Sequence, residues 1–300
     1  MSTAVPIDRE SPVTTATLRA MKSAHVPIAM VTAYDASSAR LAEGAGVDVI
    51  LVGDSLGMVV LGYDSTLPVT MGDMLRATAA VTRVTRRPLI VADMPFMSFQ
   101  IGPKEALRNA GRLMAESGAR AVKLEGGVEV APTVARIHAA GIPVMGHIGL
   151  TPQSVHELGG YKVQAAETLS ALRLLEDAHA LQDAGCFAVV LECIPAELAA
   201  MVTAELAIPT IGIGAGAGCD GQVQVFHDLL GLSGDFKPRH ARRYADAGAV
   251  IRDALAAYVG DVREGTMVTE DTCTRADPRV VVEVETARKR ARASDRPGEA

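Results

Sequence analysis

The sequence shows neither a long apolar run nor a signal-peptide pattern, so we expect no export and no membrane span. No uninterrupted apolar run approaches the roughly 18 residues that a membrane span requires. The first residues, "MSTAVPIDRESP", hold prolines and an aspartate where a signal peptide needs an apolar core, so we expect no export. The 4 cysteines show no CxxC spacing, which is typical of reduced thiols. These absences predict a cytoplasmic protein without a membrane partner.

A large excess of charge of one sign is also missing. The formal net charge is −6 and is spread along the 300 residues, so we expect no nucleic-acid partner. A short basic run, "RKRAR" (288–292), lies in a polar tail and favours a solvated segment over a nucleic-acid patch. No HxxxH pair or Cys/His set accompanies the acidic residues described below, so a zinc site is not indicated.

What the chain does have is a regular alternation of short apolar runs with longer amphipathic stretches. Hydrophobic residues make up 49% of the sequence, enough for a large core. Apolar runs without internal alternation suit strands that are covered on both faces, as in a parallel sheet. The expected strands are 28–34, 47–53, 88–93, 120–125, 142–149, 187–193, 208–216 and 222–226.

Amphipathic stretches such as 71–86, 103–118 and 167–185 predict helices between these strands. Several stretches stop at a glycine placed where a helix C-cap favours one. The alternation predicts an α/β protein with a single (β/α)8 barrel, preceded by an N-terminal helix and closed by the long helical pattern 239–265. A doubly wound open sheet is the alternative.

The two ends of the chain depart from this alternation. Residues 1–13 predict a flexible arm before a barrel domain at 14–265. Residues 266–300 form a polar tail that we expect to be partly disordered. Within this tail, "VVVEVE" (280–285) predicts an additional edge strand. The sequence does not indicate which strand it would pair with.

Acidic residues follow the apolar runs at the ends of several expected strands. Asp54, Asp93, Glu125 and Glu192 each end a different strand. In a (β/α)8 barrel the C-terminal ends of all strands lie on one face, so these carboxylates should converge. Crowded carboxylates need a cation, basic side chains or both. Lys123 lies two residues before Glu125, which places both side chains on the same face of their strand.

The chemistry of these groups indicates the kind of ion. Clustered hard oxygens favour Mg²⁺ over Zn²⁺, and Mg²⁺ ordinarily keeps waters and leaves positions for oxygens of a substrate. Any one of these acids alone is as well explained by a helix cap or an ion pair. Their shared position at strand ends favours a site.

Other signals at the strand ends leave alternatives open. His147 ends the fifth expected strand and is either a substrate contact or a structural residue. Tyr34 and Asp35 lie at the end of the first expected strand, and we expect them to contact site residues and not the substrate itself. "GIGAGAG" (212–218) loosely matches a dinucleotide fingerprint, but a turn into a strand follows it where a helix should open. We therefore expect these glycines to let the chain make a tight crossing near the mouth of the barrel.

Long motifs in the sequence resemble the ketopantoate hydroxymethyltransferase family, whose enzymes are also called 3-methyl-2-oxobutanoate hydroxymethyltransferases. The resemblance spans residues 14–265 and is carried by "VTAYDASSARLAE", "LVGDSLGMVVLGYDSTLPVT", "VADMPFMS", "VKLEGG", "GHIGLTPQSV", "GGYKVQ", "LECIPAELA" and "IGIGAGAGCDGQV". It implies a (β/α)8 barrel that transfers a hydroxymethyl group from 5,10-methylenetetrahydrofolate to 3-methyl-2-oxobutanoate. The product is 2-dehydropantoate, for pantothenate biosynthesis. The implied assembly is a homo-oligomer, typically a decamer of two stacked rings.

The same resemblance implies roles for individual residues. Asp54, Asp93 and Glu125 are expected to bind Mg²⁺, and Glu192 is expected to remove a substrate proton. The resulting enolate is stabilised by Mg²⁺. The expected substrate contacts are Asp54, Ser55, Asp93 and Lys123. No single motif encodes pterin binding, so the position of the folate stays open. The tail after residue 265 differs from the acidic, aromatic-ended segment usual in the family.

Several competing functions are compatible with parts of the sequence. A Mg²⁺-dependent lyase or mutase of the phosphoenolpyruvate type, such as isocitrate lyase, shares strand-end acids, but no "KKCGH"-like cysteine motif is present. A non-catalytic binding protein and a nicotinamide-binding protein are the remaining alternatives. Mg²⁺-dependent exchange of the substrate proton and dependence on folate separate these functions.

Overall fold

The computed structural model describes residues 11–234, 238 and 241–294. The chain divides into two compact units, Met1–Asp246 and Ala247–Ala300. Most of the expected N-terminal arm, residues 1–10, lies outside the described residues. Val13, at the end of that arm, is buried and donates its backbone N–H to the Arg87 carbonyl at 2.7 Å.

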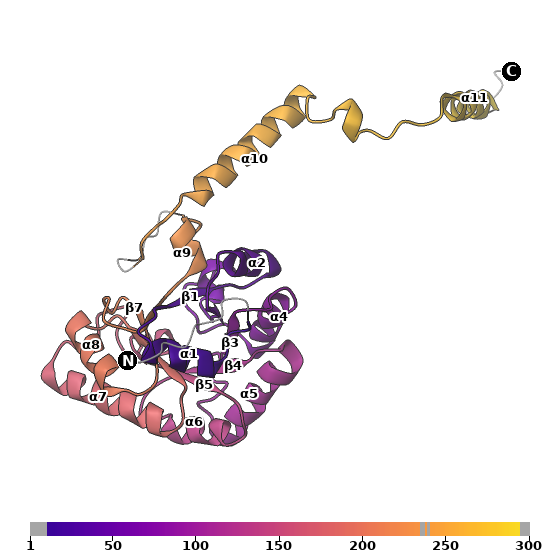
Figure 1. Ribbon diagram of the computed structural model, residues 1–300. Coiled ribbons are helices and arrows are strands. Elements are labelled where there is room, and N and C mark those ends of the chain that lie inside the picture. Colours follow the sequence, from indigo (N-terminus) through magenta and orange to yellow (C-terminus); the bar gives the residue numbers. More distant parts are fainter. Residues whose placement is uncertain (1–10, 235–237, 239–240, 295–300) are drawn as a thin grey trace. The chain divides into compact units, whose positions relative to one another are not determined.

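The first unit is a closed parallel barrel, which confirms the predicted fold and excludes an open sheet (Figure 1). Its strands pair in chain order, and the last pairs with the first. The strands are β1 (Ile28–Thr32), β2 (Val49–Val52), β3 (Leu89–Asp93), β4 (Ala121–Glu125), β5 (Val144–Gly149), β6 (Ala188–Glu192), β7 (Thr210–Ile213) and β8 (Gly221–Gln224).

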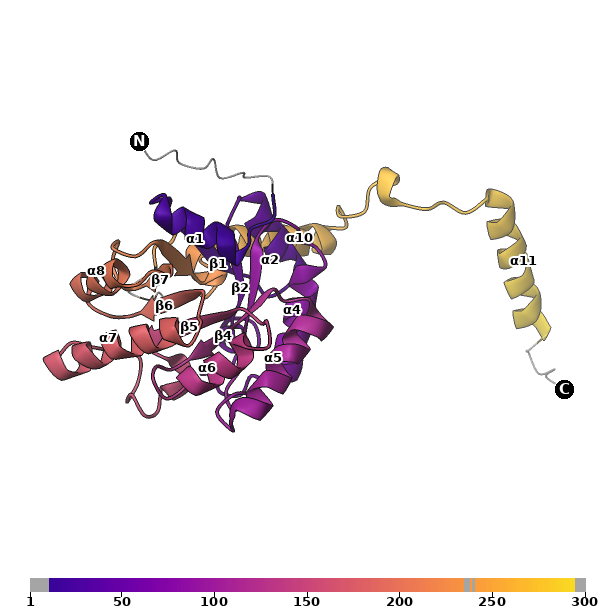
Figure 2. The same ribbon diagram turned by 60° about the horizontal axis from the view of Figure 1, so that its bottom comes forward.

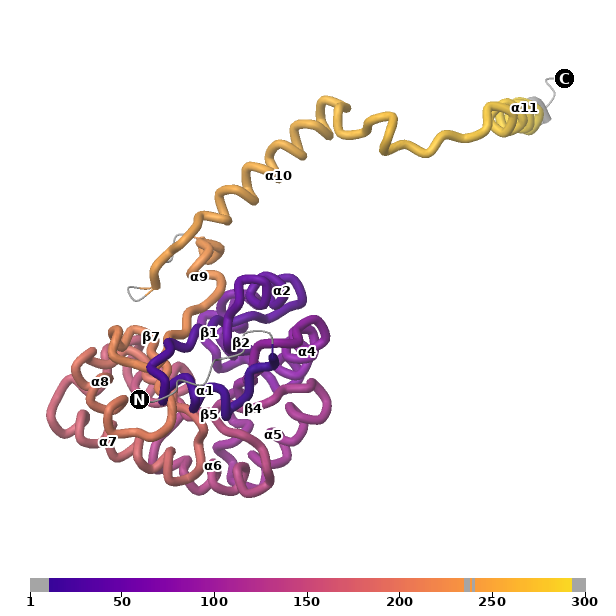
Figure 3. Tube along the Cα trace, viewed as in Figure 1, coloured from indigo at the N-terminus to yellow at the C-terminus, as the bar shows by residue number. Residues whose placement is uncertain are grey.

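Helices follow one another around the outside of the strands, as the ribbon and the tube trace both show (Figures 1 and 3). The helical segments of this unit are α1 (Thr15–Ser23), α2 (Ala36–Gly44), α3 (Leu56–Val59), α4 (Met71–Thr82), α5 (Pro103–Ser117), α6 (Ala131–His138), η1 (Pro152–Ser154), α7 (Thr168–Asp183), α8 (Ala196–Glu205) and α9 (Phe226–Leu230). The helices expected at 71–86, 103–118 and 167–185 are present as α4, α5 and α7.

Local chemistry sets the helix ends. Asp35 caps α2 by accepting the backbone N–H groups of Ser37 and Ser38 at 2.7 and 2.8 Å. Gly118 ends α5 in the left-handed conformation, at φ +76°, where a residue without a Cβ is unstrained. Pro103 occupies the first turn of α5, where its missing N–H costs nothing.

The side chains of each strand divide between two cores, because successive residues point to opposite faces. Alternate residues such as Val49, Val91 and Met145 fill the inside of the barrel together with Leu18 and Met21 of α1. The residues between them pack outward against the helices. Helix α1 therefore closes one end of the barrel interior, as the two views show (Figures 1 and 2). The opposite end, where the strands finish, is left to polar side chains.

The second unit contains α10 (Ala247–Glu264), a 3-10 turn η2 (Glu270–Thr272) and α11 (Pro278–Ser294). The expected edge strand at 280–285 is wrong, since these residues lie within α11. Asp277 caps this helix by accepting the Arg279 N–H at 2.8 Å. A helix satisfies its backbone groups locally, whereas a strand needs a neighbouring strand, and this is why the helix forms despite the valines. The run "RKRAR" lies in the same helix.

None of the helices in the described part of the chain combines the length and the apolar content that crossing a membrane requires.

Candidate active site

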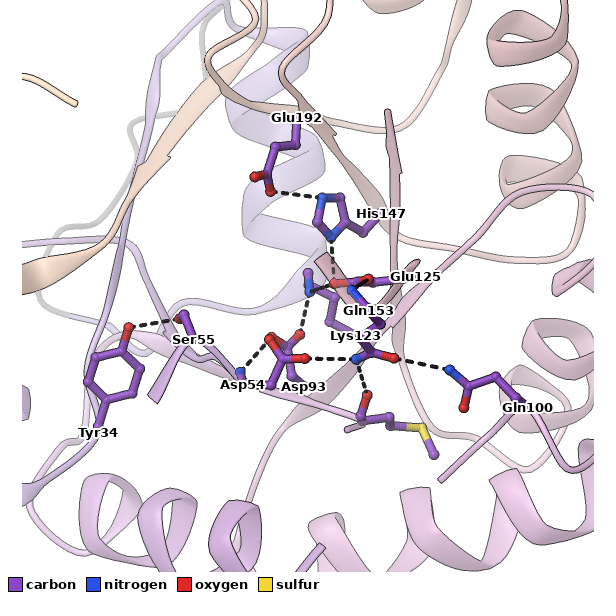
Figure 4. Close-up of polar contacts among 11 residues, drawn as sticks. Tyr34, Asp54, Ser55, Asp93, Gln100, Lys123, Glu125, His147, Gln153 and Glu192 are labelled. Atoms are coloured by element: carbon purple, nitrogen blue, oxygen red, sulfur yellow. Dashed lines mark hydrogen bonds and ion pairs between the residues drawn. The ribbon is translucent and has the colours of Figure 1, made fainter. Parts of the chain in front are cut away.

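Asp93 and Lys123 form a buried ion pair at the carboxyl ends of β3 and β4 (Figure 4). The two residues are register partners, so their side chains enter the barrel side by side. Lys123 Nζ donates to Asp93 Oδ1 at 2.6 Å, and the two side chains are only 4% and 3% exposed. Glu125 Oε1 lies 3.9 Å from the same Nζ, as expected for residues two apart on one strand.

Asp54 joins this pair from the loop after β2. Its backbone N–H donates to Asp93 Oδ2 at 3.0 Å. The preceding Gly53 makes the approach possible, because a Cβ there would lie 2.8 Å from Ser55 Oγ and 3.4 Å from Asp93 Oδ2. The three acids expected to bind Mg²⁺ are thus brought together around one lysine.

The charges in this cluster are not balanced. Burial, followed by the charges of Asp93 and Glu125, raises the pKa of the Asp54 carboxyl well above its usual value. Burial alone would lower the pKa of Lys123, but the surrounding carboxylates outweigh it and raise that pKa. Additional positive charge would therefore stabilise the ionised form of Asp54.

His147 of β5 lies between Glu125 and Glu192 (Figure 4). Its Nδ1 is 3.4 Å from Glu125 Oε1, and its Nε2 is 3.1 Å from Glu192 Oε2. These are ion-pair distances without the alignment of a hydrogen bond. Burial and the Lys123 charge lower the pKa of His147, but the carboxylates on either side of the ring outweigh them and raise it to about 9. His147 therefore connects Glu192 to the acidic cluster, and the two carboxylates favour its protonated form.

Gln153 belongs to the site although the sequence did not single it out. Its backbone N–H donates to Glu125 Oε2 at 2.9 Å, and its side-chain amide donates to Asp54 Oδ2 at 2.8 Å. The same amide donates to the Met94 carbonyl at 3.0 Å and accepts from Gln100 at 3.1 Å. The available signal was its place in "GHIGLTPQSV", but a neutral amide does not stand out by charge.

The residues around Ser55 and the glycine run have supporting positions. Tyr34 is buried, and its hydroxyl lies 2.8 Å from Ser55 Oγ, whereas Asp35 is the cap of α2. In the glycine run, a Cβ at Gly216 would lie 2.4 Å from the Ala196 Cβ of α8. The run leads into β8 and opens no helix on a phosphate, as the sequence indicated.

A cavity of about 1430 Å³ opens above these residues at the carboxyl ends of the strands. All the site residues that the sequence predicted line it: Asp54, Ser55, Asp93, Lys123, Glu125, His147 and Glu192. Their convergence from separate strands and loops is the arrangement that a (β/α)8 barrel provides for catalysis.

The donor set at the base of this cavity suits a magnesium ion held by two protein carboxylates. Among the residues that the structure describes, no group of three or more Asp, Glu, His or Cys is placed to hold a metal by itself. Mg²⁺ ordinarily takes one or two carboxylates and completes its shell with water and substrate oxygens, which Asp54 and Asp93 can provide for. Glu125 Oε1 is buried and makes no hydrogen bond in the described structure. Its place as a third ligand stays a prediction, as do those of Asp54 and Asp93.

Fold and site together define a (β/α)8-barrel enzyme with a carboxylate-lined cavity. Among solved structures, the fold is similar to phosphonopyruvate hydrolase in complex with oxalate and Mg²⁺, at a TM-score of 0.57 and 14% identity over 94% of this chain and 99% of that one. It is also similar to 2,3-dimethylmalate lyase, at a TM-score of 0.55 and 19% identity over 98% and 99% of the two chains. At these identities the likeness concerns the fold.

Sequence comparison identifies the family. The family model for ketopantoate hydroxymethyltransferase matches residues 12–269. The 3-methyl-2-oxobutanoate hydroxymethyltransferase of Chloroflexus aurantiacus is 58% identical over 84% of this chain and 89% of its own length. That of Carboxydothermus hydrogenoformans is 59% identical over 84% and 91%. The chain belongs to the ketopantoate hydroxymethyltransferase family of enzymes.

Proposed function

We propose that this enzyme transfers a hydroxymethyl group from 5,10-methylenetetrahydrofolate to 3-methyl-2-oxobutanoate and gives 2-dehydropantoate, in the pantothenate pathway. The single observation that supports it best is the placement of Glu192 across one cavity from the Asp54–Asp93–Lys123 cluster. The cluster can bind the oxygens of a keto acid, and Glu192, a separate carboxylate, can accept the proton from its C3.

The cluster at the base of the cavity binds the keto acid. Asp54 and Asp93 would hold Mg²⁺, with Glu125 nearby, and the ion when bound supplies Lewis-acid polarisation of the keto oxygen. Lys123 adds a positive charge next to the substrate oxygens, and Ser55 donates a hydrogen bond to the substrate carboxylate. Tyr34, at 2.8 Å from Ser55 Oγ, restricts the direction of that hydroxyl.

Glu192 removes the proton from C3 of the keto acid. A carboxylate is a weak base for a carbon acid, so its position and the stabilisation of the developing charge matter more than its basicity. His147, 3.1 Å from Glu192 Oε2, holds that carboxylate in place. His147 thus positions the base, and direct contact with the substrate remains a second proposed role.

The transfer balances without an oxidant or a reductant. The C3–H bond breaks, and C3 forms a carbon–carbon bond with the methylene carbon of the folate. That carbon gives up its bonds to the two folate nitrogens and takes a hydroxyl group from water. The C3 proton and one water proton end on the nitrogens, giving tetrahydrofolate.

Proton NMR of 3-methyl-2-oxobutanoate in D₂O, with enzyme and Mg²⁺, tests this function. We expect Mg²⁺-dependent exchange of the C3 hydrogen without folate, and 2-dehydropantoate only with 5,10-methylenetetrahydrofolate. Glu192→Gln should abolish exchange while keto-acid binding survives. Loss of both together would show that Glu192 is structural, and exchange without folate-dependent product would favour a lyase.

Family resemblance also supports a homo-oligomer, with a decamer of two stacked rings as the proposed assembly, and a cytoplasmic location. Sedimentation velocity of the full chain tests the assembly, and a single species at the monomer mass of 31.3 kDa would contradict it.

A further inference from the structure

The cavity is much larger than its acidic base requires. Its volume of about 1430 Å³ exceeds even the range typical of pockets for drug-sized ligands, roughly 300–1,000 Å³, and a short-chain keto acid is far smaller than such a ligand. The remaining space lies against lining residues that have no role in holding the keto acid. A second and larger reactant must bind there if the proposed function holds.

One group of lining residues differs in character from the acidic base. It consists of Met58, Tyr63, Tyr161, Lys162 and Val163, which we call the rim cluster. The tyrosines are 42% and 52% exposed, and Val163 is 63% exposed. In a chain with no Trp, 5 Tyr and 5 Phe, two half-exposed tyrosines on one cavity offer a platform for a flat ring system.

The rim cluster is joined across two segments of the chain. Tyr161, from the loop after η1, donates its hydroxyl to Met58 Sδ of α3 at 3.6 Å. Burial raises the pKa of Tyr161, and so do the charges of Asp54, Glu192 and Glu125. The phenol is therefore within electrostatic reach of acids on both sides of the place where the keto acid would react.

Lys162 gives the rim cluster a charge opposite to that of the base. Among the described residues that line the cavity, the lysines are Lys123, which is buried in its ion pair, and Lys162, which is exposed. No described acidic group lies within ion-pair distance of Lys162. An anionic group at the entrance of the cavity would therefore find an available partner.

We propose that the rim cluster is the folate subsite, with the pterin and aminobenzoyl rings packed on Tyr161 and Tyr63 and the glutamate carboxylates paired with Lys162. This inference rests on the proposed function and adds to it the position of the co-substrate. The methylene carbon lies at the edge of the pterin, so that edge must reach C3 of the keto acid. Tyr161 lines the same cavity as Asp54 and Glu192, so a ring packed on it would share that cavity with the keto acid.

Binding of tetrahydrofolate to Tyr161 variants tests the ring contact. Isothermal titration with tetrahydrofolate should give a Kd roughly tenfold higher for Tyr161→Ala, because the stacking surface is lost. Keto-acid affinity, titrated separately, should change several times less than folate affinity. Tyr161→Phe keeps the ring and should recover most of the folate affinity, which a merely unfolded loop would not explain. Tyr244→Ala, at an exposed tyrosine that does not line the cavity, is the matched control.

Removal of the glutamate tail from the ligand tests the role of Lys162. Wild-type enzyme should bind tetrahydropteroate, which lacks the glutamate, several-fold more weakly than tetrahydrofolate. Lys162→Ala should lose the same factor for tetrahydrofolate and nothing further for tetrahydropteroate. Lys104→Ala, at an exposed lysine of α5, should behave as wild type.

Two results would overturn the inference. One is tetrahydrofolate binding unchanged in Tyr161→Ala. The other is equal weakening of both folate ligands by Lys162→Ala. Absence of C3 exchange in the wild-type enzyme would instead count against the proposed function, because that measurement contains no folate.

Discussion

At the residue scale, a neutral amide links the acids at the centre of the site. Gln153 donates hydrogen bonds to Asp54 through its side chain and to Glu125 through its backbone. It thereby fixes which oxygen of Asp54 remains available to an ion. The charge pattern of the sequence located the acids but gave no reason to select the residue that orients them.

Gln153→Leu should therefore weaken the site more than the fold. The substitution removes the donors to Asp54 and to the Met94 carbonyl, and we expect a loss of about 1–3 kcal/mol in unfolding free energy. Mn²⁺ affinity, followed by electron paramagnetic resonance as a probe of the Mg²⁺ site, should fall at least several-fold. Gln100→Leu removes the donor to the Gln153 amide oxygen and the acceptor of the Phe99 N–H, leaves the Asp54 and Met94 contacts of Gln153 in place, and is the graded control. Normal Mn²⁺ affinity in Gln153→Leu would contradict a positioning role.

A second residue-scale prediction concerns protons released on metal binding. Burial and its acidic neighbours raise the pKa of Asp54. Without a cation, its carboxyl therefore keeps a proton at pH values where an ordinary aspartate is ionised. A bound cation favours the carboxylate. Mg²⁺ binding should therefore release a proton, and Mg²⁺ affinity should increase as pH rises through the raised pKa. Calorimetry in buffers of different ionisation enthalpy measures this release; proton uptake would contradict it. Asp54→Asn should abolish the release.

At the scale of elements, the strand ends decide where the functional groups lie. The sequence predicted every strand of the barrel, usually one or two residues longer than observed, because apolar runs continue slightly beyond the hydrogen-bonded ladder. The valine run at 280–285 shows the limit of that reasoning. β-branched residues favour a strand only where another strand is present to pair with them.

Gly149, at the end of β5, approaches the end of β6 closely. It pairs with Glu192, and a Cβ at Gly149, where φ is +92°, would lie 2.3 Å from the Glu192 carbonyl oxygen. Gly149→Ala must therefore shift the end of β6 that carries the base. We expect C3 exchange to fall roughly 10- to 100-fold and stability to fall by more than the strain of a left-handed residue alone, about 1–2 kcal/mol.

Gly46→Ala is the matched control for this prediction. Gly46 has φ +83° with nothing within 4 Å of the added Cβ, so the substitution costs strain without a collision. NMR exchange rates and urea unfolding of both variants make the comparison. Equal exchange rates in the two variants would show that the end of β6 tolerates the displacement.

At the scale of the whole barrel, one interior connects the closed end with the site. Leu18 of α1 is fully buried in the same cluster as the inward residues of the strands, and these lie directly beneath the acidic groups. The site is therefore built on a packed base closed by a segment distant in sequence. Closure of the barrel brings Asp54, Lys123 and Glu192 to one cavity.

Leu18→Ala should destabilise the barrel although it lies far from the chemistry along the chain. Truncation leaves a cavity in a closed interior, and we expect a loss of about 2–5 kcal/mol in unfolding free energy. Leu172→Ala, at a side chain of α7 that is 57% exposed, should change it by no more than about 0.5 kcal/mol. Urea unfolding of the two variants measures the difference, and a similar value for both would show that α1 does not close the core.

The sequence by itself determined the alternation of strands and helices, the barrel, and the acids that end the strands. These depend on local periodicity and on the rule that all strand ends of a parallel barrel lie on one face. Only the tertiary structure decided that His147 lies between Glu125 and Glu192, that Gln153 joins Asp54 to Glu125, and that Tyr161 reaches Met58. Contacts between segments distant in sequence depend on where the loops cross the barrel mouth, and no local pattern encodes that distance.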